Sequence, residues 1–374
     1  MGPLHGVKVI EVASLAPGPF GAMILADLGA EVLRVDRGGK PGEGIVSPEG
    51  PLDRGKHCIT LDLKVPEDRD TLLALAEHVD VFIEGFRPGV AERLGIGPAD
   101  LAARNPRLIY GRMTGWGQEG PLAHTAGHDI DYIAISGALG LAGRAGEPPV
   151  PPANMLADYA GGGMLLALGV LGALFERERS GKGQVIDAAM VDGSALFTAS
   201  MHGLHHLGLW NFPRGENMLD GGAPFYDTYE CADGQYLAVG CVEIPFYNQM
   251  LAILGIDDPD LPFQLDKNGW PQLKEVLGAK FKERSRDEWA EVFAGSDACV
   301  APVLSPWEAP DHPHNQARDA FIEINGVRQP APAPRFGRTP AATPAPLSAD
   351  PDQVRKLLAG WGVDAARIDH VTTP

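Results

Sequence analysis

Strand-like and helix-like hydrophobic patterns alternate along the first third of the chain. The predicted strands are short β-branched runs: Val7–Val12, Glu31–Val35, Ile59–Leu63, Val79–Ile83 and Leu108–Arg112. Helical patterns stand between them: Phe20–Leu28, Pro66–Glu77 and Pro98–Ala103. Strands that alternate with helices of this length predict an α/β fold, a Rossmann-like parallel sheet covered by helices on both faces.

A long apolar helix is predicted from Asp158 to about Arg179, with Asp158 as its N-cap. A short strand at Val185–Asp187 and a helix over Met190–Leu207 follow. The pattern changes near Gly221, where a hairpin precedes three helices. These elements are Tyr226–Tyr229 and Gln235–Val239, then Pro245–Leu254, Pro271–Lys282 and Arg286–Phe293. They predict a smaller α+β lobe.

The last part of the chain is rich in proline and alanine from Val327 to Ala349, which predicts an extended strap rather than a core. A final helix is expected over Pro351–Leu358, capped by Asp350 and docked on the first lobe. The predicted organisation is a large α/β lobe at 1–220, a small α+β lobe at 221–326, and a strap with terminal helix at 327–374 that returns to the large lobe.

Charge and cysteine content narrow the function classes. The 31 basic and 49 acidic side chains give a formal net charge of −18, which opposes nucleic-acid binding. An anionic ligand therefore needs a local group of cations. The four cysteines form no C-x-x-C pair, no secretory leader is visible, and the apolar stretch Ala160–Phe175 is expected to be a buried helix. These features predict a soluble cytoplasmic protein without a membrane partner.

The first strand–helix turn argues against dinucleotide binding. The loop Ala13–Gly21 has prolines at Pro17 and Pro19, where a G-x-G-x-x-G fingerprint needs glycines and free amides. A metal site is not expected either, because His202, His205 and His206 lack carboxylate or thiolate partners at ligand spacing.

Four cations follow predicted strands of the first lobe: Arg37, Lys64, Arg87 and Arg93. The carboxyl ends of parallel strands meet at the ligand crevice, so cations there suit a phosphate-rich ligand. Each of them taken singly is equally consistent with a solvated surface side chain.

Three further residues are candidates for chemistry. His128 precedes two carboxylates at the start of a short predicted helix, and histidine suits general acid/base work, although a structural histidine is the alternative. Asp158 precedes three glycines that leave room for a ligand, although an Asp there is also explained by capping. Glu243 lies in an apolar run as a helix-start residue or a buried acid.

Together these residues belong to a pattern of motifs that extends over nearly the whole chain. The sequence resembles the family III CoA-transferases of the CaiB/BaiF type, and within them the α-methylacyl-CoA racemases. The motifs that carry the resemblance are Leu4–Glu11, Pro17–Pro19, Asp27–Val32, Glu84–Gly89, Thr114–Gln118, Ala126–Asp129, Ala157–Tyr159, Gly181–Gln184, Gly221–Tyr226 and Ser296–Val300.

The resemblance implies two chains interlocked as a homodimer, and CoA bound as part of the substrate, with no separate cofactor and no metal. It implies catalytic roles for His128 and Asp158 as the two acid/base groups, with Glu243 supporting the histidine. The residues implied at the CoA site are Arg37, Leu61, Asp62, Leu63, Lys64, Gly85, Phe86, Arg87, Arg93, Gly127, Asp129, Ile130, Asp131 and Tyr132, with Leu61 to Leu63 lining it through backbone and side chain.

The implied reaction is racemisation of hydroxyl-free 2-methylacyl-CoA thioesters in fatty-acid metabolism, by proton removal on one face of the α-carbon and return on the other. Amides at the start of the Asp158 helix are expected to stabilise the enolate, and burial is expected to raise the pKa of Asp158. One departure is Asp131, where the racemases carry Asn, and a carboxylate there is expected to act on the pKa of His128.

The alternative is a CoA transferase that passes through an aspartyl-CoA thioester on Asp158. Asp158 is common to both reactions, whereas the transferases generally lack the histidine at His128. A non-catalytic acyl-CoA-binding protein is the third reading, against which the simultaneous presence of His128, Asp158 and Glu243 argues.

Overall fold

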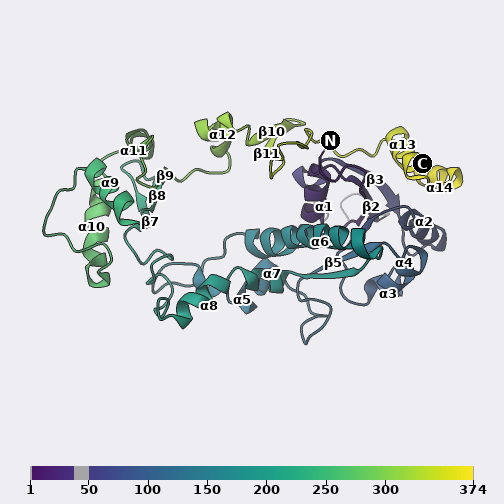
Figure 1. Ribbon diagram of the computed structural model, residues 1–374, viewed down its shortest axis with the longest axis horizontal. Helices are drawn as coiled ribbons and strands as arrows, with labels where there is room; N and C mark the ends of the chain where they lie inside the picture. Colours follow the sequence, from purple (N-terminus) through teal and green to yellow (C-terminus); the bar gives the residue numbers. More distant parts are fainter. Residues whose placement is uncertain (1, 38–49, 374) are drawn as a thin grey trace. The chain divides into compact units, whose positions relative to one another are not determined.

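The computed structural model describes residues 2–37 and 50–373 (Figure 1). It divides into two compact units. The first unit comprises Met1–Ala138, Pro152–Thr198 and Gln316–Pro374, and the second comprises Leu139–Pro151 and Ala199–Asn315. Both chain ends belong to the first unit, as the sequence predicts.

The predicted boundaries at 220/221 and 326/327 differ from this division. The helix expected over Met190–Leu207 is two helices, α7 (Met190–Leu196) and α8 (Ala199–His206), and the units divide at the break between them. At the other boundary, strands β10 (Phe321–Ile324) and β11 (Val327–Pro330) pair with each other, so the strap begins inside a hairpin of the first unit. A change in local composition can indicate where a loop begins. It does not indicate the tertiary contacts that decide to which compact unit a segment belongs.

The first unit contains a six-stranded parallel sheet in the order β3-β2-β1-β4-β5-β6. Its strands are β1 (Lys8–Val12), β2 (Glu31–Arg37), β3 (Lys56–Leu61), β4 (Val81–Glu84), β5 (Ile109–Thr114) and β6 (Val185–Ala189). The order reverses between β1 and β4, so the loops after these two strands run in opposite directions and leave a crevice at the carboxyl edge. The helices of the first half are α1 (Pro17–Asp27), α2 (Pro66–Ala76), α3 (Val90–Arg93), α4 (Pro98–Arg104) and α5 (Asp129–Ile135).

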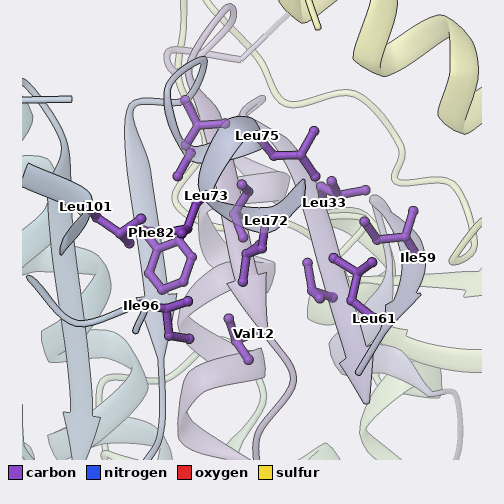
Figure 2. Close-up of a cluster of buried hydrophobic side chains, with 14 of the residues drawn as sticks. Val12, Leu33, Ile59, Leu61, Leu72, Leu73, Leu75, Phe82, Ile96 and Leu101 are labelled. Carbon is purple, nitrogen blue, oxygen red and sulfur yellow. The ribbon is translucent and has the colours of Figure 1, made fainter. Parts of the chain in front are cut away.

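One face of this sheet is apolar. Alternate residues of the strands, such as Val12, Leu33 and Leu61, are buried there together with Leu72 and Leu75 of α2 (Figure 2). Two C-terminal helices, α13 (Pro351–Trp361) and α14 (Ala365–Thr372), add Val354, Leu358, Trp361 and Ile368 to the same cluster. The terminal helix therefore docks on the first unit as predicted, and α14 is an additional helix that the sequence analysis did not identify.

The opposite face of β1, β2 and β3 is charged beneath α1. The Lys56 ammonium is fully buried, lies 2.6 Å from the Glu11 carboxylate, and donates at 3.0 Å to the carbonyl of Pro19 in α1. Beside this pair the Arg34 guanidinium contacts Asp36 at 2.6 Å and Asp53 at 2.7 Å. Burial is the main cause that raises the pKa of Glu11, and the Lys56 charge opposes it. Ion pairs hold α1 to this face of the sheet because each buried charge has a partner.

The strap is fixed to the same region. The Arg54 guanidinium donates to Asp27 of α1, at 2.6 and 3.0 Å, and to Gln329 and the Pro330 carbonyl of the strap at 2.9 and 2.6 Å. Farther along, the Ser348 amide donates to the Lys56 carbonyl and the Ser348 carbonyl accepts from the Cys58 amide. The strap therefore extends the edge of the sheet at β3, as expected of a segment that returns to the first unit.

A long apolar helix runs from the π-helical segment η3 (Met155–Met164) into α6 (Leu165–Ser180). Met155–Ser180 is long and apolar enough to cross a membrane by length and composition alone. One side of it packs against α1, β5 and β6, and only 39% of its most apolar window is buried. The prediction of a buried helix is therefore right for one face and wrong for the other, on which Met164, Leu168 and Phe175 are 51%, 62% and 69% exposed.

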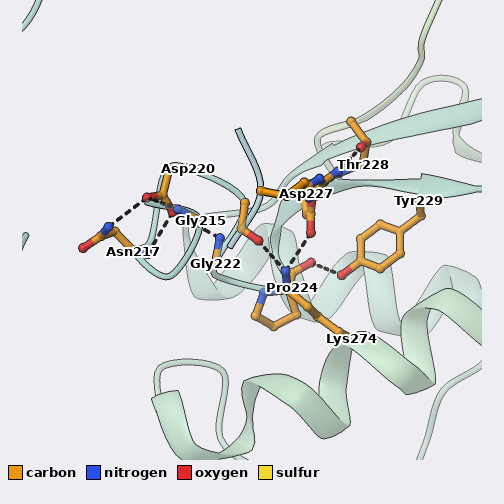
Figure 3. Close-up of polar contacts among 11 residues, drawn as sticks. Gly215, Asn217, Asp220, Gly222, Pro224, Asp227, Thr228, Tyr229 and Lys274 are labelled. Carbon is orange, nitrogen blue, oxygen red and sulfur yellow. Dashed lines mark hydrogen bonds and ion pairs between the residues drawn. The ribbon is translucent and has the colours of Figure 1, made fainter. Parts of the chain in front are cut away.

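The second unit has an antiparallel sheet of β7 (Tyr226–Glu230), β8 (Tyr236–Gly240) and β9 (Val300–Pro302), with α9 (Ile244–Leu254), α10 (Trp270–Phe281) and α11 (Arg286–Phe293). Polar contacts order the loop before β7: Asp220 accepts from the amides of Gly215, Asn217 and Gly222, and Lys274 contacts Asp227 (Figure 3). The remaining short elements are η1 (Pro51–Asp53), η2 (Leu139–Leu141), η4 (Lys267–Gly269), η5 (Ala309–Asp311) and α12 (Pro313–Ala317).

We predict that Lys56→Met destabilises the first unit by about 3–5 kcal/mol, because it leaves Glu11 as an uncompensated buried charge. Equilibrium unfolding in urea measures the loss. The double variant Lys56→Met/Glu11→Leu should recover most of it, since both charges are then absent. A single variant as stable as the wild type would show that the pair does not hold this face.

Candidate active site

A pocket of about 820 Å³ opens at the carboxyl edge of the first unit's sheet. The loop after β1, residues 13–17, and the loop after β4, residues 85–88, form two of its walls. These are the loops that diverge where the strand order reverses, which is where open α/β sheets bind ligands. The pocket brings together seven residues that the sequence analysis selected: Gly85, Phe86, Arg87, Gly127, His128, Tyr132 and Asp158.

His128 is the exposed N-cap residue of α5. Its backbone amide donates to the Asp131 carboxylate at 2.9 Å, and its imidazole has no hydrogen-bond partner in the described part of the chain. The Asp131 carboxylate is thus engaged at the backbone of His128 and not at its ring. This bond has a structural role, since an N3 carboxylate that accepts from the N-cap amide fixes the start of the helix.

Asp158 is half-buried and lies inside η3, four residues after its N-cap Asn154. The prediction that Asp158 caps the long helix is wrong, because the helix begins at Met155, one turn earlier. The Asn154 side-chain amide donates to the Asp158 carboxylate at 3.0 Å. Burial raises the pKa of Asp158, the hydrogen bond from Asn154 opposes that rise, the charge of Asp129 adds to it, and His128 lowers it. The expected raised pKa of Asp158 is therefore present.

Asp129 connects the two candidate catalytic residues. Its side chain is buried, and its Oδ2 atom accepts from the amides of Ala157 and Asp158 at 2.6 and 2.8 Å. One sequence prediction is corrected by these bonds: the amides of Ala157 and Asp158 are not free to stabilise an enolate. The Asp129 carboxylate is buried, so a contact of Asp129 with CoA stays a prediction for its backbone alone. The bonds instead hold the start of α5, and with it His128, beside the turn that carries Asp158.

The three glycines that follow Asp158 serve packing. A Cβ on Gly161 would lie 2.8 Å from the Ser194 amide nitrogen, and a Cβ on Gly163 would lie 2.6 Å from the Pro17 carbonyl oxygen. They allow α7 and α1 to approach η3 closely. The expectation that they make room for a ligand is therefore wrong, and their cost within a helix is offset by this close approach.

An aromatic pair forms the wall behind His128. The Tyr132 hydroxyl donates to the Gly127 carbonyl at 2.5 Å, and its ring lies edge-on to Trp116 at 4.8 Å between centroids. Burial raises the pKa of Tyr132 to about 12, so its hydroxyl stays protonated at neutral pH. Sequence reasoning selected Tyr132 but not Trp116, which stands in the T-G-W-G-Q motif and was not assigned to the site.

The four predicted cations Arg37, Lys64, Arg87 and Arg93 are exposed, and none forms an ion pair within the described residues. They come from β2, the loop after β3, the loop after β4, and α3, all reached from the carboxyl edge of the sheet. Arg87 lines the pocket, and the other three lie outside its wall.

Buried polar groups fix the loops that carry these cations. Glu84, at the end of β4, accepts from the Phe86 amide at 2.6 Å and contacts Arg112 at 3.1 Å. Burial raises the pKa of Glu84 to about 7, against the opposing effects of the Phe86 amide and Arg112. Sequence reasoning missed Glu84 and Arg112 as supports. The sequence feature that could have identified them is a charged residue inside a strand that is otherwise apolar and buried on both faces.

The other residues predicted for the CoA site differ in how exposed their side chains are. Leu61 is 2% exposed and belongs to the apolar core, so its side chain cannot line a ligand site and only its backbone remains available. Leu63 and Phe86 are half-buried and pack against the same core, whereas Ile130 is 46% exposed. The Asp62 carboxylate accepts from the Lys64 amide at 3.1 Å.

Glu243 belongs to the second unit, where it is the N-cap residue of α9. Its support of His128 therefore stays a prediction. No group of three or more His, Cys, Asp and Glu side chains suited to a metal ion occurs within residues 2–37 and 50–373. The first unit thus brings a histidine and an aspartate into one pocket, beside loops whose cations form no ion pair among the described residues, and this arrangement suits proton transfer on a substrate with an anionic end.

Comparison with known proteins gives the same family along most of the chain. The family model for CoA-transferase family III matches residues 4–353. The α-methylacyl-CoA racemases of Mus musculus and Homo sapiens are both 48% identical to this chain, over 91% and 90% of its length and 88% and 87% of theirs. A CAIB/BAIF family protein from Brucella suis superposes with a TM-score of 0.81 at 27% identity, covering 95% of this chain and 99% of that one.

The parallel sheet with its pocket at the strand-order reversal, the motifs, and these matches agree, and the chain belongs to CoA-transferase family III.

Proposed function

We propose that this protein racemises 2-methylacyl-CoA thioesters at their α-carbon. The observation that carries the proposal is the presence of His128 and Asp158 in one pocket, held together by the buried carboxylate of Asp129. The 48% identity to two α-methylacyl-CoA racemases supports the same reaction. CoA is part of the substrate, so no separate cofactor is required.

The α-proton of a thioester is weakly acidic, and inversion needs a base on each side of the α-carbon. His128 removes or returns the proton on one side and Asp158 on the other. One of them must be protonated while the other is not, and burial, which raises the pKa of Asp158, makes its protonated form more accessible than that of an exposed aspartate. Because Asp129 occupies the amides of Ala157 and Asp158, donors to the enolate oxygen come from elsewhere. The first turn of α5 leaves the amides of Asp129 and Ile130 without acceptors inside the helix.

The CoA phosphates are the ligand chemistry that suits the cations Arg37, Lys64, Arg87 and Arg93, which form no ion pair with the residues that the structure describes. Clustered positive charge is needed for this ligand because the whole chain carries a net charge of −18. Pocket and cations lie at the same edge of the sheet, so the thioester would enter the pocket while its nucleotide end stays among the cations.

A homodimer is the arrangement that we propose for the exposed apolar side of the long helix. Met164, Leu168 and Phe175 recur on one side of it and are each more than half exposed. Its other side packs within the first unit, and the cover that we propose for this exposed apolar surface is a second copy of this chain.

The second candidate function is CoA transfer between carboxylic acids. The accessible, half-buried Asp158 carboxylate in the pocket favours it, because the same group could attack a thioester and carry CoA as an aspartyl thioester. Such a reaction does not require His128.

Incubating one enantiomer of a 2-methylacyl-CoA in D2O separates these functions. We expect deuterium at the α-carbon together with loss of optical purity. His128→Ala and Asp158→Ala should each lower racemisation by about 10²–10⁴-fold, since each removes one acid/base group. His124→Ala, an exposed histidine of the same loop outside the pocket wall, is the matched control and should stay active. Transfer of CoA to a free carboxylate without deuterium exchange would overturn the proposal in favour of a transferase.

Removing Asn154 tests the acid/base state of Asp158. In the direction in which Asp158 is the base, activity is lost as pH falls through its pKa. The hydrogen bond from Asn154 favours the carboxylate, so Asn154→Ala should raise that pKa further and move the acidic limb of the kcat/KM profile to higher pH. A shift of roughly half to one pH unit corresponds to a bond of about 1 kcal/mol. Met155→Ala, an exposed neighbour, should leave the profile in place, and an unmoved or lowered limb in Asn154→Ala would contradict this role.

Leu168→Glu tests the dimer, because it places a charge in the middle of the exposed apolar side. We expect light scattering coupled to size exclusion to give a dimer for the wild type and a monomer for Leu168→Glu. Lys182→Glu, an exposed change just beyond the helix, should remain dimeric. A wild-type protein that is monomeric at micromolar concentration would rule the arrangement out.

A further inference from the structure

The C-terminal helix α14 is linked to the loop that follows β3 through Asp68 of α2. This loop, Asp62–Lys64, includes Lys64, one of the four predicted cations. Helix α14 comprises Ala365–Thr372, and the match to the family model ends at residue 353, before it. The contact is therefore made by a part of the chain that the family comparison does not cover.

A single carboxylate links the helix to the loop. Asp68, in the first turn of α2, accepts from the Asp62 amide through Oδ2 at 2.7 Å. Its other oxygen, Oδ1, lies 2.8 Å from the Nε2 atom of His370 in α14. The Asp62 carboxylate in turn accepts from the Lys64 amide. The chain of bonds runs from α14 through Asp68 and Asp62 to the backbone of Lys64.

The far end of this chain of bonds is anchored. Ile368 of α14 is 5% exposed and lies in the apolar core of the sheet. Arg367 donates to the Thr71 hydroxyl of α2 at 3.2 Å, and Arg355 of α13 contacts Asp369 at 2.5 Å and Thr372 at 2.7 Å. His370 is thus presented to Asp68 by a helix that is packed and bonded on both sides of it.

We infer that Asp68 and His370 are positioning residues that set the loop Asp62–Lys64 for binding the CoA part of the substrate. This inference rests on the proposed function. A carboxylate in the first turn of a helix can accept hydrogen bonds either from the amides of its own helix or from other donors. His370 holds one oxygen of Asp68, which leaves the other directed at the Asp62 amide. Without His370 the carboxylate is released and the loop loses its fixed hydrogen bond.

The expected consequence is a change in substrate binding and not in chemistry, because His128 and Asp158 lie in the pocket and take no part in these bonds. His370→Ala should raise KM for the acyl-CoA, and Kd for free CoA, by about fivefold to tenfold, the effect of losing one ordinary hydrogen bond. The value of kcat should stay within about twofold. His370→Gln keeps a side-chain donor and should recover most of the affinity.

Two controls separate the link from general loosening of α14. Glu67→Ala removes a neighbouring acid whose oxygen lies 3.7 Å from His370 Nδ1, and it should leave KM unchanged. A 2-methylacyl-pantetheine thioester, which lacks the nucleotide phosphates, should be converted equally well by wild type and His370→Ala. Asp68→Ala should weaken CoA binding at least as much as His370→Ala, and the double variant should be no worse than Asp68→Ala alone.

Calorimetric titration of the wild type with CoA distinguishes the possible failures. If the wild type does not bind CoA, the proposed function fails before the positioning role is at issue. If the wild type binds CoA and folded His370→Ala binds it equally well, the positioning role is overturned. An equal loss with the pantetheine thioester, or a fall in kcat alone, also overturns it.

Discussion

The candidate site depends on one buried carboxylate. Asp129 accepts from two backbone amides of η3 while its own backbone begins α5, so it joins the helix start at His128 to the turn that carries Asp158. A carboxylate that is 4% exposed needs such donors, because an unpaired buried charge would be strongly destabilising. The two bonds to Oδ2 of Asp129 therefore set the relative position of the two candidate acid/base residues, while its Oδ1 is buried without a partner among the described residues. They also remove from the chemistry the amides that a helix start usually offers.

The sheet provides the second constraint, because its two faces are built differently. One face is an apolar layer between the strands and α2, α13 and α14. The other, beneath α1, carries Glu11, Arg34 and Lys56, each paired with an opposite charge. Helix α1 starts from the loop that lines the pocket, and α14 is bonded to Asp68, which in turn accepts from the loop after β3. The two loops of the proposed ligand site are thus connected to two helices, α1 and α14, which pack on opposite faces of the sheet.

Much of this arrangement could be predicted from local pattern. The alternation of β-branched runs with helices predicted five strands of the parallel sheet, and each predicted strand end lies within three residues of the observed one. The cations that follow these strands lie at the carboxyl edge of the sheet, as expected. Prediction failed where a residue's partner is distant in sequence. The amides of Ala157 and Asp158 were expected to bind an enolate, Leu61 to line a ligand with its side chain, and the glycines after Asp158 to admit the substrate. The acceptor of the two amides, Asp129, is 28 and 29 residues away in sequence, Leu61 lies in the core, and the glycines pack against α1 and α7.

The sequence by itself determined the fold class, the family, and the residue types available for acid/base chemistry, because hydrophobic periodicity and motif spacing are properties of contiguous residues. Only the tertiary structure decided which groups remain free to act. In the structure the amides of Ala157 and Asp158 donate to Asp129. The Asp131 carboxylate accepts from the His128 amide, and the Asn154 side chain donates to Asp158. The tertiary structure also brought His370 to the loop after β3, across 302 residues from Asp68. The physical reason is that hydrogen bonds between distant segments depend on how helices pack on the sheet, which no local pattern encodes.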